Sequence, residues 1–183
     1  MNILTKNEEF LDLLKRGDVD ARSKFVRDNQ ENVYGLGFRM TGNRDDALDI
    51  TQETFVKALE NIRKFRGESL ISTWLYSIAA NVAKDFLRRG SKRTFVDIDE
   101  VVISADSRTP LSILEEKDER RFVREAVLSL PPKARAAFVL RFEKGLPISE
   151  IASILKRSEG TIKAQLHDSV ARIRAKLEGK NGR

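Results

Sequence analysis

The stretch that decides the fold is PISEIASILKRSEGT, residues 147–161. Its first half, through Leu155, has the apolar spacing of a short amphipathic helix. Lys156 and Arg157 form a tight turn, and Ser158 is well placed as the N-cap of a second helix, because its hydroxyl can accept a hydrogen bond from a first-turn amide. Two helices joined by so short a turn predict a helix-turn-helix, in which the second helix enters the DNA major groove.

The second predicted helix, which runs to about residue 177, has two faces that support this interpretation. Apolar residues at helical spacing predict a stripe that packs in a core: Ile162, Leu166, Val170, Ile173 and Leu177. The opposite side combines small residues, which allow close approach to a duplex, with cations that reach phosphates or base edges: Gly160, Lys163, Ala164, His167, Ala171 and Arg174. A surface helix that packs only on its neighbours is the alternative. The chain's one histidine, His167, is assigned to DNA contact rather than to catalysis because it lies on this face.

A helix predicted over residues 44–62 separates apolar from acidic residues. One face is expected to point toward a core: Leu48, Phe55, Leu59 and Ile62. Another face gathers polar residues around Val56: Asp45, Asp49, Gln52, Glu53 and Glu60. A carboxylate-rich face repels DNA, so we expect it to be solvated or to meet a protein partner.

A largely apolar helix is predicted from about residue 69 to residue 89. It carries one polar stripe: Thr73, Ser77, Asn81, Lys84 and Arg88. Aromatic residues and cations surround it in the sequence: Phe65, Trp74, Tyr76, Arg63, Lys64, Arg66, Arg89, Lys92 and Arg93. Aromatic rings stack on unpaired bases while cations follow the phosphate backbone, so this combination predicts binding of single-stranded DNA. The alternatives are that Trp74 belongs to the core and that Asn81 only faces water.

The composition excludes several classes of protein. The chain has 183 residues, enough for one ordinary domain or two small ones. It has no cysteine, which excludes disulfides and thiolate metal sites, and one histidine, which leaves little for zinc or imidazole catalysis. No apolar run has the length of a membrane helix, and the first residues do not resemble a signal peptide. We therefore expect a cytoplasmic protein that is not an enzyme, with no metal, no cofactor and no membrane insertion.

The formal net charge of +6 is divided unevenly along the chain. Residues 1–93 carry +3, residues 94–119 carry −6, and residues 120–183 carry +9. Two basic ends around an acidic middle suggest two polyanion-binding modules and a linker, although ordinary solvated surface charge is the alternative. Outside this linker, in which a helix is expected to resume near Leu111, the chain has helical patterns between glycine and proline turns. The sequence thus predicts an all-α fold: a helical bundle over residues 1–93, an extended acidic linker over 94–119, and a helix-turn-helix domain over 120–183.

Motifs in both predicted domains resemble bacterial sigma factors of the sigma-70 family, most of all the small two-domain extracytoplasmic-function (ECF) group. The resemblance lies at residues 46–55, 65–68, 73–76 and 78–83 of the first domain, and at 128–135, 149–152 and 160–163 of the second. It covers nearly the whole chain apart from the linker. The resemblance implies a factor that binds core RNA polymerase, recognises the −10 and −35 elements of promoter DNA and assists promoter melting. An anti-sigma factor is a further partner that it implies.

The same resemblance implies three sets of site residues. Core polymerase would be contacted by Leu48, Asp49, Gln52 and Glu53. A base flipped from the melted −10 strand would be held by Asn81 with Phe65 and the loop that follows it, and the −10 set as a whole is Phe65, Arg66, Gly67, Glu68, Ser77, Asn81, Lys84 and Arg88. The −35 duplex would be read by Arg157, Ser158, Gly160, Thr161, Lys163, Ala164 and His167. Asp168 departs from the family, whose members commonly carry arginine there, so −35 contacts beyond Lys163 and His167 are in doubt.

Two other functions are open at this point. A stand-alone helix-turn-helix transcriptional regulator would bind operator DNA by itself, usually as a dimer on a palindrome. An enzyme that acts on nucleic acid is the third candidate, but the sequence offers it no convincing metal or nucleophile set. The acidic helix and the polar stripe through Asn81 favour the sigma factor over both.

Overall fold

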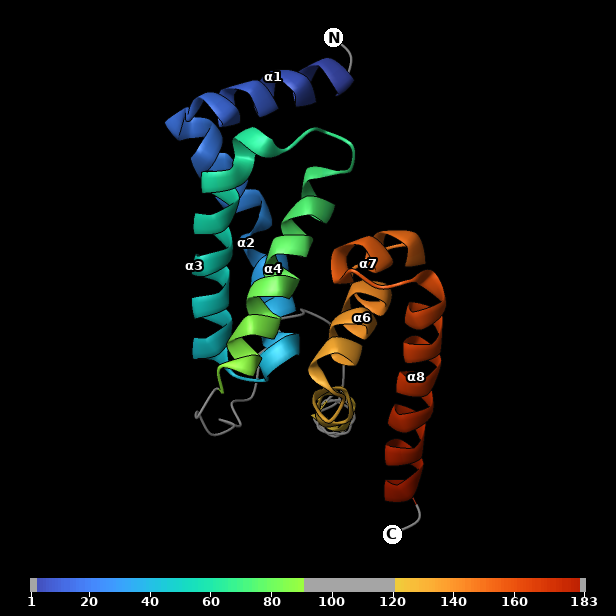
Figure 1. Cartoon of the computed structure of the whole chain (residues 1–183). Coiled ribbons are helices and arrows are strands. Elements are labelled where there is room, and N and C mark those ends of the chain that lie inside the picture. Colours follow the sequence, from blue (N-terminus) through green and yellow to red (C-terminus); the bar gives the residue numbers. More distant parts are fainter. Residues whose placement is uncertain (1–2, 91–120, 182–183) are drawn as a thin grey trace, which may run out of the picture.

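The computed structural model describes residues 3–90 and 121–181, and both ranges are helical without a strand (Figure 1). This confirms the all-α fold class. The first range contains α1 (Ile3–Arg16), α2 (Val19–Thr41), α3 (Arg44–Asn61), the 3-10 helix η1 (Ile62–Lys64) and α4 (Ile71–Arg88). The second contains a helical segment over residues 121–128, α6 (Pro132–Phe142), α7 (Ile148–Leu155) and α8 (Glu159–Asn181). The predicted linker, Lys92, Arg93 and the helix expected near Leu111 lie outside the described residues.

In the first domain, α2, α3 and α4 pack on one another around a core of large apolar side chains, while α1 lies across α2 and η1. α3 begins where expected: Gly42 takes a left-handed conformation (φ 72°), and the side chain of Asn43 accepts a hydrogen bond from the Asp46 amide at 3.0 Å. A Cβ atom added at Gly37 would lie 3.3 Å from the backbone of Ala47, so this glycine lets α2 and α3 approach closely.

In the second domain, α6, α7 and α8 pack on one another, with Leu140, Ile151 and Ile162 fully buried. The predicted apolar stripe of α8 is correct at Ile162, Leu166 and Ile173 but wrong at Val170, which is 36% exposed. Ser169 is buried in its place, because its hydroxyl donates to the Gln165 carbonyl at 2.6 Å and so needs no water.

The turn of the helix-turn-helix contains a residue in a conformation that L side chains avoid. Lys156 has φ 53° and ψ 55°, and it is the only non-glycine with positive φ in the described ranges. The left-handed region costs an ordinary residue about 1–2 kcal/mol relative to the right-handed one, and glycine escapes most of this cost. The turn is therefore built with backbone strain.

We expect Lys156→Gly to raise the free energy of unfolding by about 1 kcal/mol, since the substitution removes that strain. Lys156→Ala is the matched control, because alanine removes the same charge but keeps the Cβ atom. The two variants are compared by urea denaturation followed by circular dichroism. Equal midpoints for the glycine and alanine variants would contradict the assignment of strain to this turn.

The two domains pack against each other. α6 lies on α2 and α4, and α7 lies on α4, so that α2 and α4 together form the first domain's side of the contact (Figure 1). The guanidinium of Arg135, a buried residue of α6, donates to the carbonyl of Met40 in α2 and to those of Leu128 and Leu130 in its own domain. Arg135 therefore joins the two domains through hydrogen bonds to backbone carbonyls.

Candidate nucleic-acid interface

The polar stripe of α4 lies largely at the surface. Asn81 and Arg88 are exposed, while Ser77 and Lys84 are half-buried. Thr73 was predicted to belong to the stripe, but only 7% of its surface is exposed, so this prediction is wrong. The Ser77 hydroxyl donates to the Trp74 carbonyl at 2.6 Å, and Arg88 pairs with Asp85 at 3.3 Å. Asn81 makes no hydrogen bond with any part of the chain that the structure describes, and its amide is available to a ligand.

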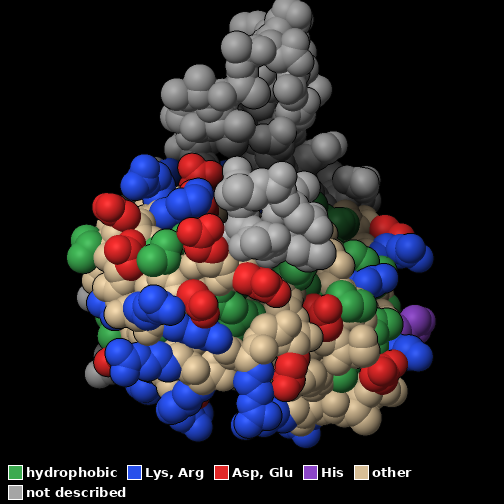
Figure 2. Space-filling view, turned by 90° about the horizontal axis from the view of Figure 1, so that it is seen from above, with side chains coloured by type: hydrophobic (Ala, Val, Ile, Leu, Met, Phe, Trp, Pro, Cys, Tyr) green, Lys and Arg blue, Asp and Glu red, His purple; other side chains and the backbone are tan. Residues whose placement is uncertain are grey.

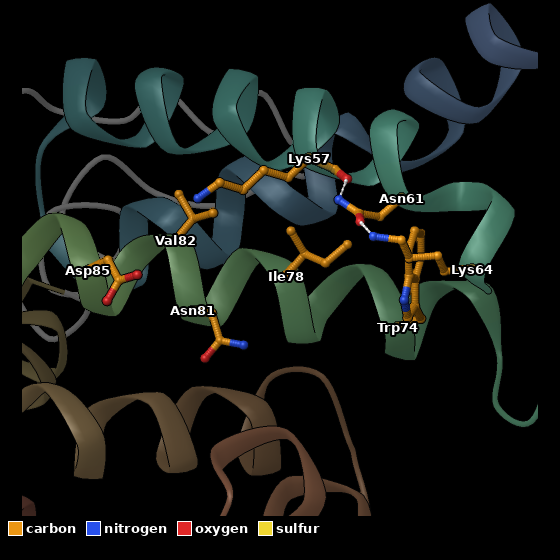
Figure 3. A pocket seen from close by; sticks show the side chains of 8 residues that line it. All are labelled: Lys57, Asn61, Lys64, Trp74, Ile78, Asn81, Val82 and Asp85. Carbon is orange, nitrogen blue, oxygen red and sulfur yellow. Dashed lines mark hydrogen bonds between the residues drawn. The ribbon is translucent and has the colours of Figure 1, made fainter. Parts of the chain in front are cut away.

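Asn81 lines a pocket of about 370 Å³ between α3 and α4 (Figure 3). The pocket combines apolar and aromatic walls, two amides, two cations and one carboxylate: Lys57, Asn61, Lys64, Trp74, Ile78, Asn81, Val82 and Asp85. Its volume falls at the lower end of the range of about 300–1,000 Å³ that is usual for small-molecule sites. A flat ring could lie against the apolar wall while amides meet its polar edge, which is how proteins hold an unstacked base.

The pocket's other polar groups are held in place by hydrogen bonds. The amide nitrogen of Asn61 donates to the Lys57 carbonyl at 2.9 Å, and its oxygen accepts from the Lys64 ammonium at 3.0 Å (Figure 3). The Lys57 ammonium pairs with Glu53 at 2.6 Å, one turn back along α3. The pocket thus has hydrogen-bonded or paired cations on the side formed by α3 and η1, and the unbonded Asn81 on its α4 side.

Phe65 does not offer a ring face to this pocket. It is 7% exposed and packs on Trp74, with ring centroids 5.2 Å apart, so its ring is covered in this conformation. A role of Phe65 in holding a base stays a prediction. The loop after it is exposed at Arg66, Gly67 and Glu68. Ten residues of α4 separate its start from Asn81, which is about 15 Å of helix. The loop and Asn81 therefore lie at different places along any strand that follows α4.

Several pocket residues were missed from the sequence. Ile78, Val82 and Asp85 follow one another at helical spacing with Asn81, and Lys57 and Asn61 are one turn apart on α3. That spacing identifies one face of each helix, but it does not tell which faces meet. Trp74 is half-buried: it packs on the core and also lines the pocket. The core position that was the alternative for Trp74 therefore does not exclude a place in the pocket wall.

The acidic face of α3 is exposed and includes two apolar side chains. Asp45, Asp49 and Gln52 are exposed, and Glu53 is half-buried beside Lys57. Val56 is 56% exposed, and Leu48, which was predicted to face the core as well as a partner, is 50% exposed. Its core assignment is therefore wrong. Apolar side chains among carboxylates on a free surface are typical of a protein-binding site.

The start of α8 presents the residues predicted to read duplex DNA. Ser158 caps the helix: its hydroxyl oxygen accepts from the Thr161 amide at 3.2 Å, as predicted. The whole predicted set is exposed: Arg157, Ser158, Gly160, Thr161, Lys163, Ala164 and His167. His167 projects at the edge of the molecule beside basic side chains in Figure 2, and its ring nitrogen Nδ1 is 3.7 Å from the carboxylate of Asp168. Asp168 thus places a negative charge next to this surface.

Lys84 lies where the two domains meet. The pKa of Lys84 is lowered, mainly because the side chain is partly buried. The carboxylate of Asp85 opposes this shift, whereas three cations of the second domain add to it: Lys133, Lys156 and Arg157. Cations from both predicted DNA surfaces are therefore close together in this arrangement.

These features define a class: an all-α protein with an exposed, basic helix-turn-helix in one domain and a pocket beside an exposed amide in the other. Among the described residues no cluster of acids and histidine could hold a metal ion, and none of the described helices is both long and apolar enough to cross a membrane. Residues 25–93 match the family described as Sigma-70 region 2, and residues 121–173 match Sigma-70, region 4.

Several known proteins are similar to this chain over almost its full length. The ECF RNA polymerase sigma factor SigW of Bacillus subtilis is 32% identical over 90% of this chain and 92% of its own. The ECF RNA polymerase sigma-E factor of Haemophilus influenzae is 29% identical over 94% and 95%. Two solved structures share the fold at 19% identity: CnrH in complex with the cytosolic domain of CnrY (TM-score 0.69, 93% and 96% covered), and RpoE of Bartonella quintana in complex with the anti-sigma factor NepR (TM-score 0.66, 85% and 96%).

The chain belongs to the ECF group of the sigma-70 family. It associates with core RNA polymerase and directs transcription initiation at promoters. The alternative of a stand-alone helix-turn-helix regulator is not favoured, because the matches extend over both domains.

Proposed function

We propose that three surfaces divide the work of initiation. The acidic face of α3, with Leu48, Asp49, Gln52 and Glu53, docks on core polymerase. The pocket beside Asn81, with Lys84, Arg88 and the loop after Phe65, holds the melted −10 strand. The start of α8 reads the −35 duplex. The observation that carries this proposal is the unbonded Asn81 amide in a pocket with an aromatic wall and two cations.

Within the −10 site, the lining of the pocket leads us to assign the flipped base to residues other than the set expected from the sequence. Asn81 meets the polar edge of one flipped base, Trp74 and Ile78 form its apolar wall, and Lys57 and Lys64 neutralise the adjoining phosphates. Arg66, Gly67 and Glu68 contact a different nucleotide, since about 15 Å of helix separates their loop from Asn81.

The remaining features follow from the same proposal. The chain acts in the cytoplasm with polymerase and is not itself an enzyme; the polymerase catalyses the reaction. The domains correspond to residues 1–93 and 120–183, with the acidic residues 94–119 as their linker. An anti-sigma factor is a partner, supported by the solved structure of RpoE of Bartonella quintana in complex with the anti-sigma factor NepR.

Reconstitution tests the whole proposal. The purified chain is added to core polymerase with a library of promoter fragments, and run-off transcripts are sequenced. Transcripts that depend on the chain and share two spaced elements are expected. Tight operator binding without polymerase, and no dependent transcript, would contradict it.

The docking surface has its own test. Leu48→Arg is expected to weaken binding to core polymerase about tenfold, because it places a desolvated cation where an apolar side chain enters the interface. Val19→Arg, the same change at a residue 73% exposed on α2, is the control. Affinities are measured by fluorescence titration with labelled core enzyme. If both variants bind like the wild type, α3 is not the docking surface.

A further inference from the structure

Asp168 is the one acidic residue of α8 between Glu159 in its first turn and Glu178 near its end. The Asp168 side chain is 73% exposed, and its carboxylate makes no hydrogen bond with the part of the chain that the structure describes. The one basic group within 4.0 Å of it among those residues is the His167 ring, whose Nδ1 is 3.7 Å away. Two side chains so exposed gain little from their attraction. The carboxylate of Asp168 is therefore available to a ligand.

Helical spacing places Asp168 on the surface proposed to read the −35 duplex. Successive residues of an α-helix are about 100° apart, so Thr161, Ala164 and Asp168 form one row along α8. All three are exposed. The buried residues of this stretch lie on another side of the helix: Ile162, Leu166 and Ser169. Since Thr161 and Ala164 belong to the proposed −35 set, Asp168 continues the same surface by one more turn.

The Asp168 side chain can come close to base edges. Nine residues separate Asp168 from Glu159, which is about 14 Å of helix. The major groove is about 12 Å wide, and a recognition helix enters it with its N-terminal residues. Ala164 and Ala171, one turn before and one turn after Asp168, are exposed and too small to hold the helix away from the bases. Asp168 therefore lies within the part of α8 that a major groove can take in.

A carboxylate in the major groove distinguishes the four bases by their polar groups. An ionised carboxylate only accepts hydrogen bonds. Guanine presents the acceptors N7 and O6, and thymine presents the acceptor O4, so both repel it. Adenine has the donor N6 beside the acceptor N7, a pair that an amide side chain matches better. Cytosine offers the N4 amino group with no acceptor of its own in this groove, so it is the base that fits a carboxylate.

A solvated charge beside the duplex is the alternative for Asp168. A carboxylate that only faced the DNA backbone would repel phosphates and weaken binding to every sequence alike. A carboxylate that meets a base edge would instead favour promoters with one base and penalise the others. The two alternatives thus differ in whether the effect of Asp168 depends on sequence.

We propose that Asp168 is a specificity-determining residue: its carboxylate accepts a hydrogen bond from the N4 amino group of a cytosine in the −35 element. This chain then requires a G·C pair in one orientation at one position of that element. The proposal rests on the proposed function of the start of α8, and it adds a base and a residue to that function.

Base preference at the −35 element is measured by run-off transcription with saturating core polymerase. The promoter found by reconstitution is kept, and its −35 element is randomised. The wild-type chain is expected to favour cytosine at one position about fivefold, the lower end of what a good base contact gives. Asp168→Ala should lose the preference at that position alone. Asp168→Asn should shift it to adenine, because an amide can pair with both N6 and N7 of that base.

Glu178→Gln is the matched control, because it also changes an exposed carboxylate of α8 to an amide, ten residues further along the helix. Its base profile should equal that of the wild type at every position. An Asp168→Asn chain with an unchanged base profile and more transcript from every promoter would overturn the proposal, since the carboxylate would then only repel phosphates. A shift toward adenine is not expected from a mere loss of folding.

The pairing of residue and base is tested by a second measurement. Wild-type and Asp168→Asn holoenzymes are titrated with two labelled promoters that carry cytosine or adenine at the selected position. The wild type should bind the cytosine promoter about fivefold more tightly, and the variant should prefer the adenine promoter. Equal ratios for both holoenzymes would overturn the proposal. A randomised library without a preferred base at any −35 position would contradict the proposed function of α8 as well, whereas preferences that persist without Asp168 would contradict the role of Asp168 alone.

Discussion

In an Asn81→Ala holoenzyme, the equilibrium constant for promoter opening is expected to fall about 30- to 100-fold, while binding to core polymerase is unchanged. A hydrogen-bonded contact to a base edge contributes about 1–3 kcal/mol, and extruding the base costs a few kcal/mol that this contact helps to offset. A loss of about 2–2.7 kcal/mol corresponds to that range of equilibrium constants. Asn81 is exposed and lines the pocket, so its truncation removes the contact without disturbing the core.

The measurement is permanganate reactivity of thymines in the −10 element. Gln30→Ala is the matched control, because it removes an exposed amide from α2 outside the pocket. The assay uses saturating core polymerase, so that only holoenzyme is compared. Reactivity equal to that of the Gln30→Ala holoenzyme would show that Asn81 does not hold a base.

Arg135→Ala is expected to lower the free energy of unfolding of the second domain by about 3 kcal/mol or more. Arg135 is 8% exposed, and its guanidinium donates to three backbone carbonyls, those of Met40, Leu128 and Leu130. Each buried acceptor left without a donor costs about 1–3 kcal/mol. Burial lowers the pKa of Arg135, yet an arginine side chain stays protonated in proteins, so the charge and its hydrogen bonds persist over the ordinary pH range.

Two spectroscopic probes distinguish the unfolding of the second domain from that of the first. Trp74 is the chain's one tryptophan and reports on the first domain, while circular dichroism reports on helices of both. In the Arg135→Ala chain, the dichroism transition should begin at lower urea than the Trp74 fluorescence transition. Lys133→Ala, which removes an exposed cation two residues away in α6, should leave the two transitions where they are in the wild type. Similar midpoints for both variants would contradict the structural role of Arg135.

The sequence was informative wherever a local signal determined the structure. Gly42 and Asn43 end α2 and begin α3, and Ser158 caps α8, because turn and cap chemistry depends only on neighbouring residues. The absence of strands in the described ranges follows from apolar spacing in the same way. The predicted DNA surface of α8 is exposed as expected, since small residues and cations on one face leave it nothing to pack with.

The errors occur where burial depends on a neighbour far along the chain. Leu48 and Val170 have the spacing of core residues, but they are 50% and 36% exposed, because no helix of the described ranges covers them. Phe65 looks like a free aromatic in the sequence, yet Trp74 packs on it. A helical pattern gives the direction of a side chain and not the partner at that place, so the pocket between α3 and α4 and the packing of the domains could not be predicted.

The contact between Arg135 and α2 has a consequence for sequence variation, because its acceptor is the backbone carbonyl of Met40. Every amino acid carries that carbonyl, so a substitution at position 40 changes the side chain and leaves the acceptor in place. Position 135 has no such freedom, since the carbonyls of Met40, Leu128 and Leu130 need a side chain with several N–H donors. Related chains that keep this packing should therefore vary at position 40 while they retain arginine at position 135.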